Sequence, residues 1–147
     1  IDKKPLSTWS KYNKINNFGR LLDMKFEVSE PGRVIYSMPI TEDILATTSA
    51  AHGGALAAFM DAIIGVASLS AVAEEGKLVS TVEFKINYLK PAFLNDQLRG
   101  FGKVIKKGKR IIISQGEILN QKDELLAICT GTLNAYPVEK NDILGSK

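Results

Sequence analysis

The apolar and polar pattern in the first third of the chain predicts a short helix followed by a strand hairpin. Residues Ser7–Asn17 have the spacing of a short amphipathic helix, with Gly19 as its stop. Residues Met24–Val28 and Arg33–Met38 are typical of extended segments, and the turn sequence at 30–32 joins them. We therefore expect two neighbouring antiparallel strands after the first helix.

The longest apolar stretch, Gly54–Ala73, predicts one helix that is buried on most of its faces. At ~1.5 Å per residue it would be about 30 Å long. A membrane span is the alternative interpretation. Asp61 lies near the middle of the stretch, where hydrocarbon would cost it about 3 kcal/mol, and strands follow directly. We therefore expect a central helix of the fold and no membrane partner.

After Gly76 the period of hydrophobicity changes to two. Val82, Phe84, Ile86 and Tyr88 alternate with polar residues, which predicts a strand with one buried face. Further strands are expected around Leu98–Ile105, Ile111–Leu119 and Leu125–Tyr136. The odd positions of the last strand are mostly small, as a face packed closely under a helix should be: Ala127, Cys129, Gly131, Leu133 and Ala135.

Together these elements predict an α+β fold in which a curved antiparallel sheet wraps around one long central helix. The chain, residues 1–147, is expected to form a single domain with its core at about 18–136 and a polar tail at 137–147. A helix that is apolar on nearly every side needs more cover than one sheet gives. We expect a second subunit to provide that cover.

Composition narrows the chemistry. The 147 residues are 45% apolar and 24% charged, as in a globular protein with one core. A single cysteine, Cys129, and a single histidine, His52, exclude an internal disulfide and a zinc cluster, so no metal site is expected. The net charge of +3, and a basic cluster at 103–110 without interleaved aromatic residues, do not favour nucleic acid. No signal peptide is evident, so the cytoplasm is expected.

Asp61 is the main catalytic candidate. No cation lies three or four residues from it, and a buried unpaired carboxylate is costly. It must meet a partner from another segment, reach water, or have a raised pKa. A structural Asp hydrogen-bonded across a dimer interface is the alternative. Gly54, Gly65 and Ser68 share its helix face, which leaves room for a ligand or simply for close helix packing.

The sequence His52-Gly53-Gly54 stands at the expected start of the long helix. Free N–H groups and the positive end of the helix dipole favour an oxyanion or a carbonyl oxygen there. Gly53 lies eight residues before Asp61, or ~12 Å along the axis, which is too far for both to touch one reacting carbon. If both act, they come from different chains, and the site lies between two facing helices.

With these residues the chain resembles the hotdog-fold acyl-CoA thioesterases of the phenylacetate-pathway type, within the 4-hydroxybenzoyl-CoA thioesterase superfamily. The resemblance covers roughly Phe18 to Tyr136. It is carried by His52-Gly53-Gly54, the acid nine residues after the histidine, the strand Thr81–Asn87 with its continuation to Lys90-Pro91, the basic turn Lys106-Lys107-Gly108-Lys109-Arg110, and Thr130-Gly131-Thr132.

The resemblance implies a hotdog fold, a homodimer or a tetramer of two dimers, and hydrolysis of acyl-CoA to free acid and CoA without a cofactor, CoA being part of the substrate. Asp61 would be the general base or nucleophile, and the Gly53 N–H would polarise the carbonyl. His52 would orient that carbonyl or its loop, and Thr81 would lie near the attacking water. CoA would be bound by Gly54, Lys90 and the basic turn, which comprises Lys106, Lys107, Gly108, Lys109 and Arg110.

Two positions depart from the family pattern. Members often have an Asn six residues before the histidine and a Gly three before it, where this chain has Ala46 and Ser49. Thr47, Thr48 or Ser49 are possible replacements for the Asn. The departure leaves a non-catalytic acyl-CoA-binding module as the alternative function, with a hydratase on the same fold as a third. The basic turn is equally compatible with a solvated hairpin tip.

Overall fold

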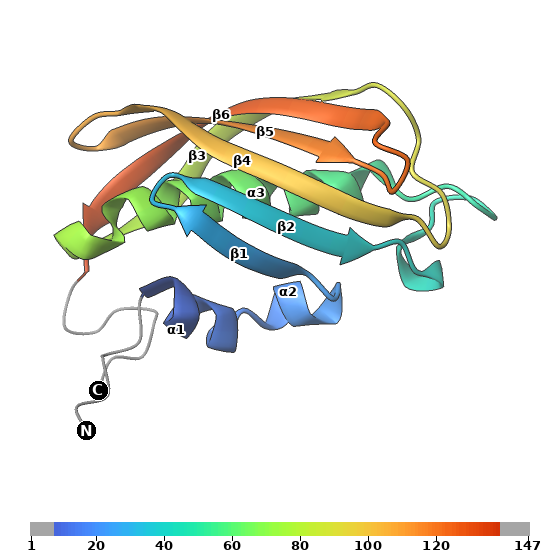
Figure 1. The fold of residues 1–147 in the computed structure, drawn as a ribbon, viewed down its shortest axis with the longest axis horizontal. Coiled ribbons are helices and arrows are strands. Elements are labelled where there is room, and N and C mark those ends of the chain that lie inside the picture. The colour runs from blue at the N-terminus through green and yellow to red at the C-terminus, as the bar shows by residue number, and fades with distance from the viewer. Residues whose placement is uncertain (1–7, 139–147) are drawn as a thin grey trace.

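The computed structural model describes residues 8–138, in which an antiparallel sheet curves around one long helix, α3 (Gly53–Val72) (Figure 1). The sheet has six strands in the order β1-β2-β4-β5-β6-β3. Their bounds are β1 Lys25–Glu30, β2 Arg33–Pro39, β3 Lys77–Tyr88, β4 Gln97–Lys107, β5 Ile111–Leu119 and β6 Leu125–Pro137. Shorter helices are α1 (Thr8–Ile15), α2 (Asn17–Leu21), η1 (Glu42–Ile44) and η2 (Ala73–Glu75).

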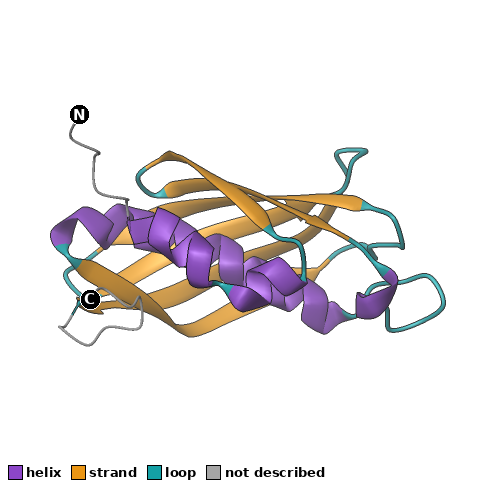
Figure 2. Ribbon diagram, turned by 90° about the horizontal axis from the view of Figure 1, so that it is seen from below, coloured by secondary structure: helices purple, strands orange, loops and turns teal. Residues whose placement is uncertain are grey.

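This arrangement confirms the predicted sheet and central helix, and Figure 2 shows α3 lying across one face of the strands. The predicted hairpin is β1–β2. It joins the other strands because β2 pairs with β4, with Val34 opposite Gly102. The hairpin and the later strands therefore form one continuous sheet.

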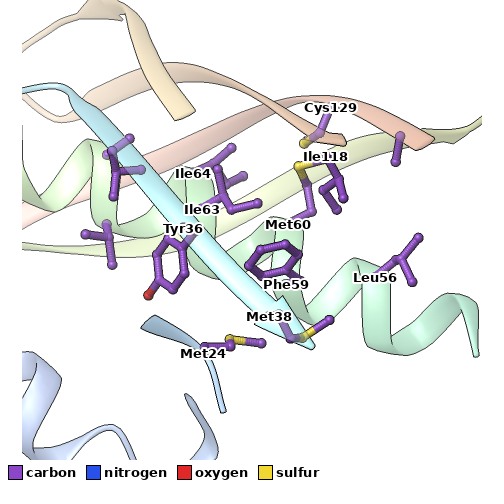
Figure 3. Close-up of a cluster of buried hydrophobic side chains, with 14 of the residues drawn as sticks. Met24, Tyr36, Met38, Leu56, Phe59, Met60, Ile63, Ile64, Ile118 and Cys129 are labelled. Atoms are coloured by element: carbon purple, nitrogen blue, oxygen red, sulfur yellow. The ribbon is translucent and has the colours of Figure 1, made fainter. Parts of the chain in front are cut away.

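The core is formed where α3 lies directly over glycines of the sheet. Gly102 of β4 pairs with Gly116 of β5. A Cβ at Gly102 would come within 2.8 Å of the Ile63 carbonyl oxygen, and one at Gly116 within 2.7 Å of Met60 Sδ. Met60, Ile63 and Ile64 are fully buried in the space these glycines leave (Figure 3). Because these glycines have no side chain, they determine how closely α3 approaches the sheet.

The small face predicted for the last strand is confirmed. Ala127, Cys129, Leu133 and Ala135 are all at most 5% exposed. At Gly131 a Cβ would lie 2.5 Å from Cδ1 of Ile64, so this strand too is in direct contact with α3.

The prediction of one buried face on β3 is only partly correct. Phe84 and Ile86 are half-buried, but Val82 is 59% exposed and Tyr88 is 51% exposed. β3 is an edge strand, and its register with β6 shifts between Thr81 and Glu83, which leaves Val82 as the extra residue of a β-bulge. Tyr88 is exposed because it lies at the far end of β3, beside the first residue of α3.

The predicted first helix is wrong at its C-terminal end. It ends at Ile15, and Gly19 lies inside a second short helix, α2. The reason is local, because the Asn16 side chain accepts a hydrogen bond from the Gly19 N–H and so starts a new turn. The expected first residue, Ser7, lies outside the described residues, as does most of the expected polar tail; Pro137 still belongs to β6.

The segment Gly53–Glu75 is long and apolar enough to cross a membrane by length and composition. Within the fold, however, 61% of its most apolar window is buried. The positions left partly exposed include Ala57, Ala58, Asp61, Ala62 and Gly65. The sheet therefore covers one side of α3 and leaves a strip of small residues around Asp61 uncovered.

The close approach of α3 predicts opposite effects for two Gly→Ala changes. Gly102→Ala should lower the free energy of unfolding by about 1–3 kcal/mol, because the new methyl group meets a backbone oxygen. Gly65→Ala, a matched control within α3, should raise it by up to about 1 kcal/mol, because no atom lies within 4 Å of the new Cβ and alanine favours helix. Urea unfolding of both variants measures the difference. Equal effects would contradict this account of the packing.

Candidate active site

Asp61 lies in the middle of α3 and is half-buried. The Thr81 hydroxyl of β3 donates a hydrogen bond of 2.7 Å to Asp61 Oδ1. Within residues 8–138 no lysine or arginine forms an ion pair with Asp61. Of the outcomes that the sequence left open, the structure thus shows a polar partner from a distant segment. Within residues 8–138 no donor bonds to the second carboxylate oxygen.

A β-bulge aims Thr81 at the carboxylate. Thr81 pairs with Leu133, which is fully buried on the helix side of β6. Three residues later, Phe84 pairs with Gly131, on the same side. In a regular strand, residues three apart face opposite sides, but the extra residue Val82 restores the orientation. The strict alternation expected from the sequence would have turned Thr81 away from Asp61.

Asp61 and Thr81 open on a hollow of about 340 Å³ between α3, the sheet and the α1–α2 segment. Gly65 lines it together with Asp61, as their shared helix face predicts. Ser68 does not. Its hydroxyl is buried, donates to the Ile64 carbonyl and lies 2.7 Å from the Ser114 hydroxyl of β5. The face of α3 that was expected to form one ligand-binding surface is therefore divided. Asp61 and Gly65 line the hollow, whereas Ser68 contacts β5, because α3 crosses from one strand to another.

A larger hollow, of about 710 Å³, lies on the outer face of the sheet, away from α3. Phe101, Gln115 and Ile128 are among its lining residues, and none of the predicted catalytic residues is. We therefore place the candidate site at the smaller hollow, where a carboxylate and a hydroxyl converge.

The second half of the predicted site lies at the N-terminus of α3. His52 is the N-cap, and its Nδ1 accepts a 2.8 Å hydrogen bond from the Gly54 N–H. The Gly53 N–H meets no acceptor within residues 8–138. Gly53 thus keeps a free donor at the positive end of the helix, whereas the Gly54 donor is occupied. The His52 imidazole holds its own helix start, and within the described chain it does not contact Asp61.

Sequence reasoning missed two tyrosines. The Tyr88 hydroxyl donates a 2.7 Å hydrogen bond to the Gly53 carbonyl and so fixes the end of β3 to the start of α3. Tyr12 of α1 lines the hollow, and its pKa is raised, first by burial and then by the negative charge of Asp61. No sequence signal indicates Tyr12, since α1 reaches α3 only through the tertiary fold.

The predicted CoA-binding residues are exposed, and several are already paired. Lys90 forms a 2.8 Å ion pair with Glu124, whose pKa is lowered by that hydrogen bond. Lys107 pairs with Glu75 at 2.9 Å, which places the basic turn beside the C-terminal end of α3, the end opposite Gly53 (Figure 1). Lys106, Lys109 and Arg110 form no ion pair within residues 8–138. Gly108 closes the turn through its N–H to the Ile111 carbonyl.

The loop before His52 contains the three candidate replacements for the missing Asn. Thr47 Oγ1 accepts hydrogen bonds from the N–H groups of Ser49 and Ala50, which fix its oxygen in its own turn and leave its O–H as a donor. Thr48 and Ser49 are exposed. Ala46 itself contributes only backbone, its N–H bonding to the Ala50 carbonyl.

Other nucleophile and metal chemistry finds little support in residues 8–138. Burial raises the pKa of the Cys129 thiol to about 11, so the sulfur stays protonated at neutral pH and is a weak nucleophile. Within the described range, no three His, Cys, Asp or Glu residues come together as metal ligands. That the protein needs no cofactor stays a prediction.

Comparisons with known proteins identify the architecture. Residues 49–127 match the model of the thioesterase superfamily. Human acyl-coenzyme A thioesterase 13 is 31% identical over 109 residues, which cover 74% of this chain and 76% of that protein. The solved structure of the E. coli PaaI protein from the phenylacetic acid degradation operon has a TM-score of 0.80 at 22% identity, covering 87% of this chain and 92% of that one.

A second solved structure, of smu.793 from Streptococcus mutans bound to acetyl CoA, has a TM-score of 0.71 at 27% identity. It covers 78% of this chain and 89% of that one. Together these similarities confirm the hotdog fold that the sequence predicts.

The capping geometry predicts how His52 variants behave. His52→Ala should lower the free energy of unfolding by about 0.5–2 kcal/mol, because the Gly54 N–H loses its acceptor. His52→Asn should lose much less, since Asn is a preferred N-cap. Thermal unfolding of the two variants measures the difference. A loss in His52→Asn as large as in His52→Ala would show that the imidazole does more than cap the helix.

Proposed function

The chain belongs to the thioesterase superfamily, and from this premise we propose that it hydrolyses acyl-CoA thioesters to a free acid and CoA, with Asp61 as the catalytic carboxylate. The observation that carries the proposal is the Thr81–Asp61 hydrogen bond at the edge of a hollow. Human acyl-coenzyme A thioesterase 13 and the acetyl CoA bound by smu.793 support the choice of CoA esters.

The proposed chemistry needs one carboxylate and one carbonyl-polarising donor. Asp61 either takes a proton from the attacking water or attacks the carbonyl carbon itself; both roles need its charged form. Thr81 donates to one carboxylate oxygen, and its own oxygen can accept a hydrogen bond from the water. If water attacks, its oxygen bonds to the carbonyl carbon, the C–S bond breaks, and the CoA sulfur takes the proton that Asp61 removed from the water. If Asp61 attacks, the C–S bond breaks to leave an acyl–Asp61 anhydride, which a water molecule then hydrolyses to the free acid.

The carbonyl-polarising donor would be the Gly53 N–H of a second subunit. It has no acceptor in the described part of its own chain and lies at the positive end of α3, where developing negative charge is stabilised. It also lies eight residues, or ~12 Å of helix, from Asp61 of its own chain. A homodimer, or a tetramer of two dimers, would join the two halves.

Features of the single chain favour such a partner. β3 is an edge strand, and Val82 on it is 59% exposed. The strip of small residues around Asp61 on α3 is not covered by the sheet. A second copy placed along β3 would pair this edge, since an open edge is unfavourable, and it would cover Ala57, the residue of the strip that does not line the hollow.

We assign the CoA phosphates chiefly to the cations of the basic turn that form no ion pair with the described part of the chain: Lys106, Lys109 and Arg110. Lys90 and Lys107 would have to leave Glu124 and Glu75 to contribute. Gly54 would act through its position beside Gly53 rather than as a donor, because its N–H bonds to His52.

Replacing the carboxylate tests the proposed function. Asp61→Asn should keep the fold and lower kcat for acyl-CoA hydrolysis at least about a hundredfold, because an amide neither accepts the proton nor attacks. Asp43→Asn, at an exposed position in η1, is the matched control. A panel of acyl-CoAs with a thiol-detecting dye measures turnover. Retention of a tenth of wild-type turnover by Asp61→Asn would contradict the role of Asp61.

The shared site is tested with a variant that removes one N–H group. Gly53 is the first residue of α3, where proline is favoured, and His52 has φ −65° and ψ 135°, which suits a residue before proline. Gly53→Pro should therefore fold but lose the donor, lowering kcat about 10²–10³-fold. Gly53→Ala keeps the N–H and should lose far less.

Mixing Gly53→Pro with Asp61→Asn subunits then tests whether each site takes Asp61 from one chain and Gly53 from the other, or both from the same chain. Each parent should be inactive, but a mixed dimer keeps one complete site, so activity should return to about half that of wild type per mixed dimer. If subunit exchange is demonstrated by mass spectrometry and activity stays absent, the two halves do not come from different chains.

A further inference from the structure

The hollow beside Asp61 extends away from the catalytic pair under the N-terminal helices. Asp61 and Thr81 form its polar edge on α3 and β3, Asn16 and the hydroxyl-bearing Tyr12 lie on the side of the N-terminal helices, and the other lining residues are apolar. The apolar wall comes from α3, β3, β6 and the residue before β1: Ala58, Ala62, Val66, Leu69, Leu78, Val79, Leu133 and Met24. The opposite wall is formed by α1 and α2, with Tyr12 and Phe18 as its large side chains.

The charge of the hollow limits what it can bind. Asp61 is the only residue lining it, within the described chain, that carries a charge at neutral pH, and no Lys, Arg or His lines it. The raised pKa of Tyr12 keeps that hydroxyl neutral. A carboxylate in the hollow would meet no cation and would be repelled by Asp61, whereas a hydrocarbon chain would be stabilised by the apolar wall.

We propose that this hollow binds the acyl group of the substrate, that the group is uncharged and apolar, and that Tyr12 and Phe18 of the N-terminal helices limit its length. The inference rests on the proposed thioester hydrolysis at Asp61 and adds the class of acyl group. The reacting carbonyl would lie at the polar edge, and the hydrocarbon would point toward α1 and α2.

A substitution at Gly65 can change the hollow without disturbing the core. It lies on α3 four residues after Asp61 and lines the hollow. A Cβ built there meets no atom within 4 Å, unlike one at Gly102 or Gly116. A larger side chain at position 65 therefore enters the space proposed for the acyl group rather than the packed interface with the sheet.

The experiment compares wild type with Gly65→Leu and Gly65→Ala on straight-chain CoA esters from acetyl to decanoyl. In wild type, each methylene that the hollow buries should raise kcat/KM by up to about fourfold, until the hollow is full. In Gly65→Leu the ratio of kcat/KM for octanoyl-CoA to that for butanoyl-CoA should fall at least about tenfold. Gly65→Ala, which alters helix propensity but fills little space, should change that ratio far less.

Two further measurements test whether the opposite wall limits the acyl length and whether the hollow disfavours a negatively charged acyl group. Phe18→Ala should move the preferred acyl length upward, because it shortens the opposite wall. Glutaryl-CoA, whose acyl group ends in a carboxylate, should be hydrolysed with a kcat/KM at least about tenfold lower than that of the uncharged five-carbon ester, pentanoyl-CoA.

The outcomes separate this inference from the proposed function. If wild type hydrolyses CoA esters but Gly65→Leu lowers kcat/KM equally at every chain length, the hollow does not bind the acyl group. If glutaryl-CoA matches pentanoyl-CoA, the assigned class of acyl group is wrong. If purified wild type hydrolyses none of the esters, the proposed function itself fails, and this inference fails with it.

Discussion

The close contact between α3 and the glycines of the sheet is the constraint on which the rest of the structure depends. Gly102, Gly116 and Gly131 let the backbone of three adjacent strands approach the helix, and Met60, Ile63 and Ile64 fill the space above them. Because one side of α3 is committed in this way, the opposite side is oriented as well. Asp61 then faces β3 and the hollow, where it accepts the hydrogen bond from Thr81.

The same helix carries both chemical groups of the proposed site but cannot bring them together. The free N–H of Gly53 is at its first turn, held by the His52 cap and the Tyr88 hydroxyl, and Asp61 is two turns further along. A rigid helix keeps them apart. Association of two chains is then part of the proposed mechanism, because each subunit would supply half of two sites.

In the proposed mechanism, catalysis and the choice of acyl group would be carried by different parts of the fold. The Asp61–Thr81 pair joins the central helix α3 to β3, which pairs with β6 in the sheet. The far wall of the hollow belongs to α1 and α2, two short helices outside the sheet. Substitutions of Tyr12 and Phe18 would not disturb the glycine contacts, so under the proposal the preferred acyl length would change while the chemistry at Asp61 stays the same.

The sequence by itself determined the six strands and the long helix, because burial imposes a period of two on strands and an apolar surface on a central helix, but it did not determine the break between α1 and α2. It also indicated Asp61 as the catalytic candidate, since a carboxylate without an intrahelical cation stands out in an apolar helix, and it predicted the small face of β6. Only the tertiary structure decided that the Val82 bulge turns Thr81 toward Asp61, that Tyr12 faces the same hollow, and that Ser68 and Lys90 are occupied by Ser114 and Glu124. The reason is physical. These features depend on the register between strands far apart in the chain and on how the helix crosses them. The local pattern of apolar and polar residues determines neither.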